Sequence, residues 1–291
     1  PFIRGLSYNG RKGAVVHRAD ESVVPKTPMP GAESLLPLEV EGEDIREVLP
    51  NAYRNYCEIN GCFPPVVHWR GHEVYFCGQS YDTAVEIEKQ FISNGCISRE
   101  NSEKWNSAAP DGAQPEKSGR DKVVDGRISL VTGGAQGFGE SIVRELVSAG
   151  SLVWVADLNV DGAAELCTEL NRNAGCTVSL PVSVNVTDED AVEAMVSHIV
   201  AECGGIDLLI SNAGVLKAGS VKDLALNDFE FVTKVNYTGF FLCTKHVSRV
   251  MAAQNMPSGL YYTDIIQINS KSGLEGSNKN AAYAGGKFGG I

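Results

Sequence analysis

Short apolar segments alternate regularly with amphipathic segments of helix length from Val123 to the end of the chain. Because strands buried on both faces read as continuous apolar runs, this alternation predicts an α/β fold built on a Rossmann-type, doubly wound parallel sheet with helices on both faces. The expected strands cover residues 128–132, 151–157, 177–184, 206–211 and 264–270. The expected helices cover about 137–149, 161–172, 188–203 and 226–253, with a further one beginning near 281.

The first part of the chain predicts a smaller α/β segment. Apolar spacing indicates a helix that ends near Gly61 and another, over residues 81–94, that stops at Gly95. Between them, residues 64–80 read as a hairpin with its turn at Arg70-Gly71-His72. The side chains expected to face inward are Ile45, Val48, Leu49 and Tyr53 on the first helix and Ala84, Val85, Ile87 and Phe91 on the second.

A polar stretch rich in Gly, Pro and Ser, residues 106–122, lacks apolar periodicity and predicts a linker. We therefore expect one domain over residues 1–105 and a second over residues 123–291.

Composition narrows the range of partners and compartments. A net charge of −11 at pH 7 disfavours nucleic acid and anionic membranes as partners. No apolar run approaches the roughly 18 residues that a membrane span needs. Eight cysteines without a CxxC pair indicate reduced thiols in the cytoplasm instead of a disulfide scaffold. The sequence begins with Pro1, not Met, which leaves an upstream targeting segment open.

A glycine-rich turn, Thr132–Gly139, connects the first strand of the second domain to its first helix. Glycines let the backbone approach a pyrophosphate, and the amides and dipole of a helix N-terminus favour its negative charge. The alternative is a plain tight turn. At the end of the second strand, Asp157 can accept the ribose hydroxyls of an adenosine and would repel a 2′-phosphate, which favours NAD over NADP. The alternative for Asp157 is a polar strand cap.

Further motifs then complete a resemblance to the short-chain dehydrogenase/reductase family. The turn has the spacing TGxxxGxG, and a YxxxK motif lies 13 residues after a serine. The resemblance implies a catalytic set of Asn236, Ser270, Tyr283 and Lys287. It implies cofactor contacts from Thr132, Gly133, Gln136, Gly137, Phe138, Gly139, Asp157, Asn185, Val186, Asn212, Ala213, Gly214, Tyr283 and Lys287.

The chemistry of these residue types agrees with that assignment. Tyr283 and Lys287 are four residues apart and share one helix face. A phenol, with a pKa of about 10, is a poor base near neutrality, and a neighbouring ammonium would favour its phenolate. Tyr283 would then exchange a proton with the substrate oxygen, Ser270 would hydrogen-bond that oxygen, and Asn236 would position a water beside Lys287.

The sequence departs from the family in three places. Asn185 stands where the family has Asp, which we expect to weaken the contact with adenine. Gly285 and Gly286 lie between Tyr283 and Lys287, and Gly289-Gly290 follow, so the catalytic helix should be soft, since each glycine costs a helix about 1 kcal/mol relative to Ala. The chain stops at Ile291, and we expect the family's remaining strand, lid and last helix to be missing and this fragment to be poorly active.

The segment around the predicted hairpin resembles the late part of the class II aldolase/adducin fold. Arg70-Gly71-His72 lies at the turn and Gly78 ends the second strand. Followed by a linker and a short-chain dehydrogenase, it resembles bifunctional aldolase/dehydrogenases of deoxy-sugar breakdown. Zinc needs about three protein ligands, but the sequence has no HxH and Glu73 replaces the family's glycine after the histidine, so no metal site is expected.

Three functions therefore stay open. The first is an NAD-dependent oxidoreductase for a small alcohol, aldehyde or ketone, homo-oligomeric when full length. The second is a sugar-phosphate aldolase with an attached dehydrogenase. The third is a module that binds NAD without turnover.

Overall fold

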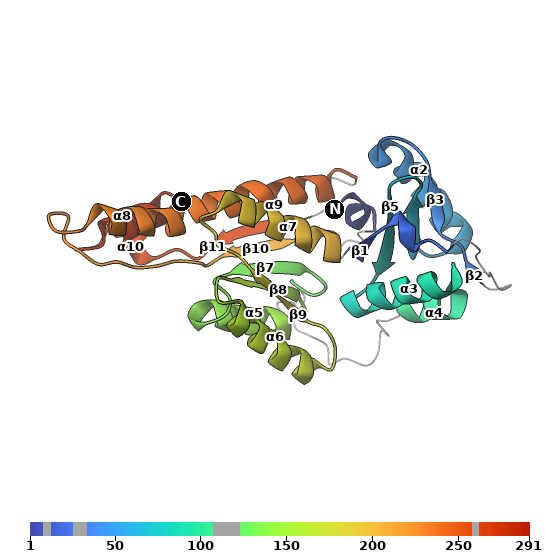
Figure 1. The fold of residues 1–291 in the computed structure, drawn as a ribbon, viewed down its shortest axis with the longest axis horizontal. Helices are drawn as coiled ribbons and strands as arrows, with labels where there is room; N and C mark the ends of the chain where they lie inside the picture. The colour runs from blue at the N-terminus through green and yellow to red at the C-terminus, as the bar shows by residue number, and fades with distance from the viewer. Residues whose placement is uncertain (8–12, 26–33, 107–122, 258–261) are drawn as a thin grey trace. The chain divides into compact units, whose positions relative to one another are not determined.

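The computed structural model describes residues 1–7, 13–25, 34–106, 123–257 and 262–291, and it contains two compact units (Figure 1). The first unit comprises Pro1–Arg127 with Ile199–Gly205 and Met251–Tyr262, and the second comprises Ile128–His198, Ile206–Val250 and Thr263–Ile291. The predicted linker, residues 106–122, lies outside the described residues except for Asn106.

The first unit contains a four-stranded mixed sheet in the order β1-β5-β4-β3. Its strands are β1 (Val15–Asp20), β3 (Leu38–Val40), β4 (Val66–Trp69) and β5 (Glu73–Gly78). The predicted hairpin is confirmed as the antiparallel pair β4–β5. Shorter elements accompany the sheet: α1 (Phe2–Leu6), η1 (Glu21–Val23), α4 (Arg99–Asn106), and a two-residue pair of β2 (Ser34–Leu35) with β6 (Ile97–Ser98).

Two predicted helices pack with the strands of the sheet to form the apolar core of this unit. Helix α2 (Ile45–Asn60) ends at Gly61 and helix α3 (Tyr81–Asn94) ends at Gly95, each cap being left-handed with φ near 70°. On the inward faces Leu49, Tyr53, Ala84, Ile87 and Phe91 are buried, whereas Ile45, Val48 and Val85 are partly exposed.

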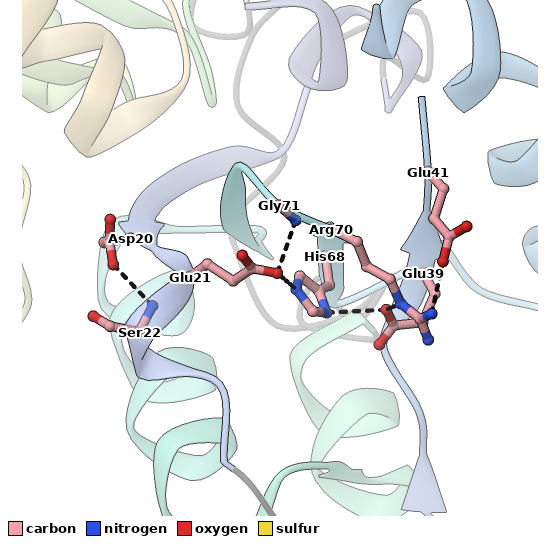
Figure 2. Close-up of polar contacts among 8 residues, drawn as sticks. All are labelled: Asp20, Glu21, Ser22, Glu39, Glu41, His68, Arg70 and Gly71. Atoms are coloured by element: carbon pink, nitrogen blue, oxygen red, sulfur yellow. Dashed lines mark hydrogen bonds and ion pairs between the residues drawn. The ribbon is translucent and has the colours of Figure 1, made fainter. Parts of the chain in front are cut away.

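A polar network surrounds the hairpin turn of the first unit (Figure 2). The buried His68 ring has Nε2 2.8 Å from Glu21 Oε1 and Nδ1 3.0 Å from Glu39 Oε2. The Gly71 amide also donates to Glu21 Oε1, at 2.9 Å. Arg70 Nε donates to Glu39 Oε2 at 2.6 Å. Carboxylates from the segments after β1 and in β3 thus hold the turn between them.

The second unit contains a five-stranded sheet in the order β11-β10-β7-β8-β9, with every neighbouring pair parallel. The strands are β7 (Ile128–Thr132), β8 (Leu152–Asp157), β9 (Ser179–Ser183), β10 (Leu208–Ser211) and β11 (Asp264–Gln267). Helices α5 (Gly137–Ser148) and α6 (Val160–Ala174) lie on one face, and α7 (Glu189–Cys203) and α9 (Gly239–Asn255) on the other (Figure 1). The doubly wound parallel sheet predicted from the sequence is therefore confirmed.

Two predicted elements differ from the structure. The helix expected over 226–253 is divided into α8 (Leu226–Thr233), a π-helical turn η2 (Lys234–Thr238) and α9. The strand expected over 264–270 ends at Gln267, because Ser270 leaves the sheet and caps a short helix, α10 (Lys271–Glu275), with its side chain. The last helix, α11 (Ala281–Phe288), begins where it was predicted.

The Glu21 contacts predict an acid-sensitive turn. The hydrogen bond from the Gly71 amide, aided by His68, lowers the pKa of Glu21 below its ordinary value of 4.5. The ionised carboxylate therefore stabilises the turn above that value, and the stabilisation is lost as the pH falls through the folded-state pKa. We expect the exchange protection of the Gly71 amide, measured by NMR, to decrease as the pH is lowered in the parent chain. In Glu21→Gln the protection should not decrease in this way. Glu86→Gln, at an exposed position of the same unit, serves as the control; equal pH dependence in all three chains would refute the assignment.

Candidate functional site

A large cleft runs along the carboxyl ends of the strands in the second unit. Its volume is about 1200 Å³, above the 300–1000 Å³ typical of sites for drug-sized ligands. Most residues predicted from the sequence line it: Gly133, Gln136, Gly137, Phe138, Gly139, Asp157, Asn185, Val186, Asn212, Ala213, Gly214, Ser270, Tyr283 and Lys287. The cleft lies where strand order reverses between β7 and β10, as expected for a doubly wound sheet.

The glycine-rich turn leaves open backbone at the start of α5. Gly137 has φ of 60°, and a Cβ added there would meet no atom within 4 Å. A Cβ at Gly139 would lie 1.9 Å from the Gly133 carbonyl oxygen, so only glycine permits this approach. Gln136, at the N-cap, makes no capping bond through its side chain. The first amides of α5 therefore face the cleft without a side-chain cap, which suits a phosphate.

Thr132 has a different place from the one predicted. It is fully buried and does not line the cleft. Its hydroxyl accepts from the amides of Asn212 and Ala213, both at 3.1 Å. In return, Asn212 Nδ2 donates to the carbonyl oxygens of Thr132, at 3.1 Å, and Gly133, at 2.9 Å. Thr132 thus joins the loops that follow β7 and β10 instead of lining the cleft.

Asp157 fixes the end of β8 and also lines the cleft. Its Oδ2 accepts from the Ala135 amide at 3.0 Å, and its Oδ1 from the Asn159 amide at 2.9 Å. The capping role considered from the sequence is therefore present. Each carboxylate oxygen can accept a further bond, so this role leaves room for a ligand hydroxyl.

Asn185 caps its own turn at the edge of the cleft. Its Oδ1 accepts from the Thr187 amide at 3.1 Å and from the Thr187 hydroxyl at 2.9 Å. These contacts leave the Asn185 side-chain amide nitrogen as the group that would face a ligand.

Ser270, Tyr283 and Lys287 all line the cleft. Lys287 is 5% exposed, its Nζ donates to the Ile268 carbonyl oxygen at 2.5 Å, and it lies 5.8 Å from the centre of the Tyr283 ring. Burial lowers the pKa of Lys287 below its ordinary value. The Ser270 hydroxyl accepts from the Ser272 amide at 3.2 Å. The sequence spacing of these three residues is thus realised as a single cluster.

Asn236, the fourth predicted catalytic residue, lies behind the cleft and not in its lining. It is buried inside the π-helical turn η2. Its Oδ1 accepts from the Val215 amide at 2.8 Å, and its Nδ2 donates to the Val215 carbonyl oxygen at 2.9 Å. Asn236 therefore holds the loop after β10 to the helical segment, and π-helical turns often mark functional sites.

Several lining residues were missed by the sequence analysis. Leu158 follows β8, Leu216 follows the Asn212-Ala213-Gly214 motif, and Phe231 and Lys234 come from the helical segment α8–η2. Leu158, Leu216 and Phe231 are unusually exposed for large apolar side chains, at 73%, 55% and 46%. Their only signal in the sequence was adjacency to a motif or strand end, because an apolar helix residue reads the same whether it faces a core or a cleft.

The first unit gives no metal centre in the part of the chain that the structure describes. No group of three His, Cys, Asp or Glu side chains is placed there to hold a metal ion. His72, considered as a ligand, stacks on the Trp69 ring at 3.9 Å between centroids. Among the helices described, none is long and apolar enough to cross a membrane.

Comparison with known proteins finds relatives that match a little over half of the chain. Sorbitol-6-phosphate 2-dehydrogenase of Escherichia coli (strain K12) is 35% identical over 165 residues, covering 57% of this chain and 62% of that protein. The crystal structure of sorbitol-6-phosphate 2-dehydrogenase SrlD from Erwinia amylovora matches with a TM-score of 0.53 and 38% identity, covering 56% of this chain and 61% of that one. The uncharacterized oxidoreductase YuxG of Bacillus subtilis (strain 168) is 29% identical over 158 residues, which cover 54% of this chain and 22% of that protein.

The chain thus spans about three fifths of the sorbitol-6-phosphate 2-dehydrogenases that it matches. The family profile of the short chain dehydrogenases matches residues 127–291, more than half of the chain. The cleft, its glycine-rich turn and the Ser270–Tyr283–Lys287 cluster all lie within these residues. The chain belongs to the short chain dehydrogenase family.

Proposed function

We propose that this chain carries the cofactor site and the proton-transfer groups of an NAD-dependent oxidoreductase. Its reaction would be hydride transfer between nicotinamide and a small alcohol or carbonyl compound. One observation carries the proposal: Ser270, Tyr283 and Lys287 line the same cleft as the glycine-rich turn and Asp157. A dinucleotide whose phosphates bind at the turn can then reach the proton-transfer groups with its other end.

The residues of the cleft suit that cofactor. The uncapped amides at the start of α5 would hold the pyrophosphate, and Asp157 would accept the ribose hydroxyls. Asn185 and Val186, also in the lining, would border the adenine. When bound, the nicotinamide supplies hydride chemistry at the carbon that carries the substrate oxygen.

The chain's own groups would then manage the proton and the charge. The Tyr283 hydroxyl would give a proton to the substrate oxygen in reduction and take it in oxidation. The Lys287 ammonium, buried beside the Tyr283 ring, would stabilise the phenolate that forms. The Ser270 hydroxyl would donate a hydrogen bond to the same substrate oxygen and hold it in place.

A polyol or a polyol phosphate is the substrate class that we propose. Both sorbitol-6-phosphate 2-dehydrogenases named above act, by their names, on a phosphorylated polyol, and they are 35% and 38% identical to this chain. In such a substrate the reacting group is a secondary alcohol, which matches the chemistry of the Tyr283 cluster.

A second proposal concerns residues 1–105, which the sequence predicts to be a separate domain, followed by a linker over 106–122 and the dehydrogenase domain over 123–291. We propose that residues 1–105 are the late part of a class II aldolase/adducin-like domain, so that the intact protein would combine a sugar-phosphate lyase with a dehydrogenase. The packing of Gly78 supports this, since a Cβ there would lie 2.5 Å from the Ala84 amide nitrogen and the strand–glycine–helix order depends on glycine. The match to only 22% of YuxG shows that this kind of module occurs inside a much longer chain.

The cofactor choice is tested at Asp157. Asp157→Asn keeps an acceptor for the Ala135 amide but removes the charge that would repel a 2′-phosphate. We expect the ratio of NAD to NADP affinity to fall by about tenfold, or about 1.4 kcal/mol. The measurement is a calorimetric titration of each cofactor into the protein, with Asp161→Asn at a nearby exposed position as the control. Tighter binding of NADP than NAD by the parent protein would contradict the role of Asp157.

The proton-transfer role is tested at Tyr283. Tyr283→Phe removes the only titratable atom of that side chain, and we expect turnover to fall about 10²–10⁴-fold while NADH binding is retained. Tyr262→Phe removes a hydroxyl from an exposed tyrosine and should leave turnover unchanged. Initial rates of polyol oxidation, followed by NADH absorbance, provide the measurement. Full turnover by Tyr283→Phe would contradict the assignment of Tyr283 as the proton-transfer group.

A further inference from the structure

The segment that follows β11 makes two hydrogen bonds to Lys287, near the end of α11. The Ile268 carbonyl oxygen accepts from Lys287 Nζ at 2.5 Å. The next residue, Asn269, donates from Nδ2 to the Lys287 carbonyl oxygen at 2.9 Å. Lys287 is therefore held through both its side chain and its main chain by two consecutive residues.

The other half of the Asn269 carboxamide points back to the catalytic serine. Asn269 Oδ1 accepts from the Ser270 amide at 2.8 Å. One planar group thus bonds the main chain of Ser270 with its oxygen and the main chain of Lys287 with its nitrogen. Because a carboxamide is rigid, it fixes the spacing between those two points.

The carbonyl that Asn269 bonds lies in the last turn of α11. The helix has eight residues, two of them glycine, and it stops at Phe288. The Lys287 carbonyl belongs to the last turn, where carbonyl groups have no helical partner. The contact from the Gly290 amide to this carbonyl is longer, at 3.4 Å, than the 2.9 Å bond from Asn269 Nδ2. Asn269 therefore donates the shorter of these two hydrogen bonds to the Lys287 carbonyl.

Glycines on both sides allow this close approach. A Cβ at Gly273 would lie 2.7 Å from Asn269 Oδ1 and 3.0 Å from the Lys287 carbonyl carbon. A Cβ at Gly290 would lie 1.9 Å from Gln267 Oε1. Gly290, which was expected from the sequence to soften the helix, thus permits the contact between the end of α11 and Gln267 at the end of β11.

We propose that Asn269 is a positioning residue that sets the distance between Ser270 and Lys287 through the two ends of its carboxamide. The proposal rests on the proposed function, since it matters to the reaction only if these groups handle the substrate proton. Asn269 acts through Ser270 and Lys287 and transfers no proton itself. Sequence motifs did not indicate it, because its partner lies 18 residues away.

Two variants, Asn269→Asp and Asn269→Ala, test the hydrogen bonds of Asn269 to Ser270 and Lys287. The aspartate keeps an acceptor for the Ser270 amide but has no donor for the Lys287 carbonyl, and the alanine removes both of these bonds without adding charge. Each variant also loses the 3.3 Å bond from Asn269 Nδ2 to Gln267 Oε1. Asn278→Asp makes the same charge change at an exposed asparagine and is the matched control. We expect the amides of residues 285–291 to exchange hydrogen at least several-fold faster in both Asn269 variants, by mass spectrometry, and at the parent rate in Asn278→Asp.

Steady-state kinetics of the enzyme provide the second readout. Both Asn269 variants should lose kcat by about 10–100-fold, the size expected for a displacement near 1 Å, with the KM for NAD within about twofold. The pH dependence of kcat should shift in both, because a displaced Lys287 main chain changes the distance between the Lys287 ammonium and Tyr283. A purely structural role would lower the amount of folded enzyme and leave its pH profile unchanged.

The results separate the two proposals. Parent-like exchange in both Asn269 variants overturns the positioning role, and so does faster exchange with unchanged kcat and pH profile. If the parent enzyme binds NAD but shows no turnover with polyols or polyol phosphates, the proposed function fails. The exchange rates then still decide whether Asn269 holds the end of α11.

Discussion

The arrangement of the site depends on the reciprocal hydrogen bonds between Thr132 and Asn212, which connect the loops after β7 and β10. Strands β7 and β10 are neighbours at the centre of the parallel sheet, and their connections leave toward opposite faces. That divergence opens a crevice at their carboxyl ends. Four hydrogen bonds connect the segment that begins at Thr132 with the segment that begins at Asn212, where the two strands end. The glycine-rich turn and the loop of Asn212 can therefore face one ligand from two sides.

The close approach of these two loops also explains which residue types occur there. A Cβ at Gly133 would lie 2.9 Å from the Ala213 Cα, so the two loops pack at main-chain distance. Farther along the cleft, Asn236 ties the Asn212 loop to the π-helical turn, and Asn269 ties the end of β11 to α11. Three asparagines, each bonded to main-chain atoms, thus connect segments that side-chain packing alone would leave free to shift. The Asn269 contacts connect Ser270, the N-cap of α10, to Lys287, which lies with Tyr283 in α11.

Much of the fold and most of the cleft could be predicted from the sequence. Long periodic segments such as α2, α3 and α6 have clear apolar faces and stop at glycine, and strands such as β7 and β8 are continuous apolar runs. Elements without those signals were missed: β3 has three residues, and β1 is apolar only in its first half. The π-helical turn was missed because its residues continue the apolar pattern of a helix. Thr132 was placed at the cofactor because its motif is read as a unit, yet its hydroxyl pairs with amides 80 residues away. Asn269 was missed for the same reason, since its partner is a main-chain atom that leaves no mark in a sequence.

The most direct test of the account is a crystal structure of the chain with NADH. We expect the pyrophosphate to bind at the amides of Gly137 and Phe138, a ribose to bind Asp157, and the nicotinamide to lie beside Tyr283 and Lys287. A dinucleotide bound elsewhere, or one whose nicotinamide lies away from Tyr283, would contradict it.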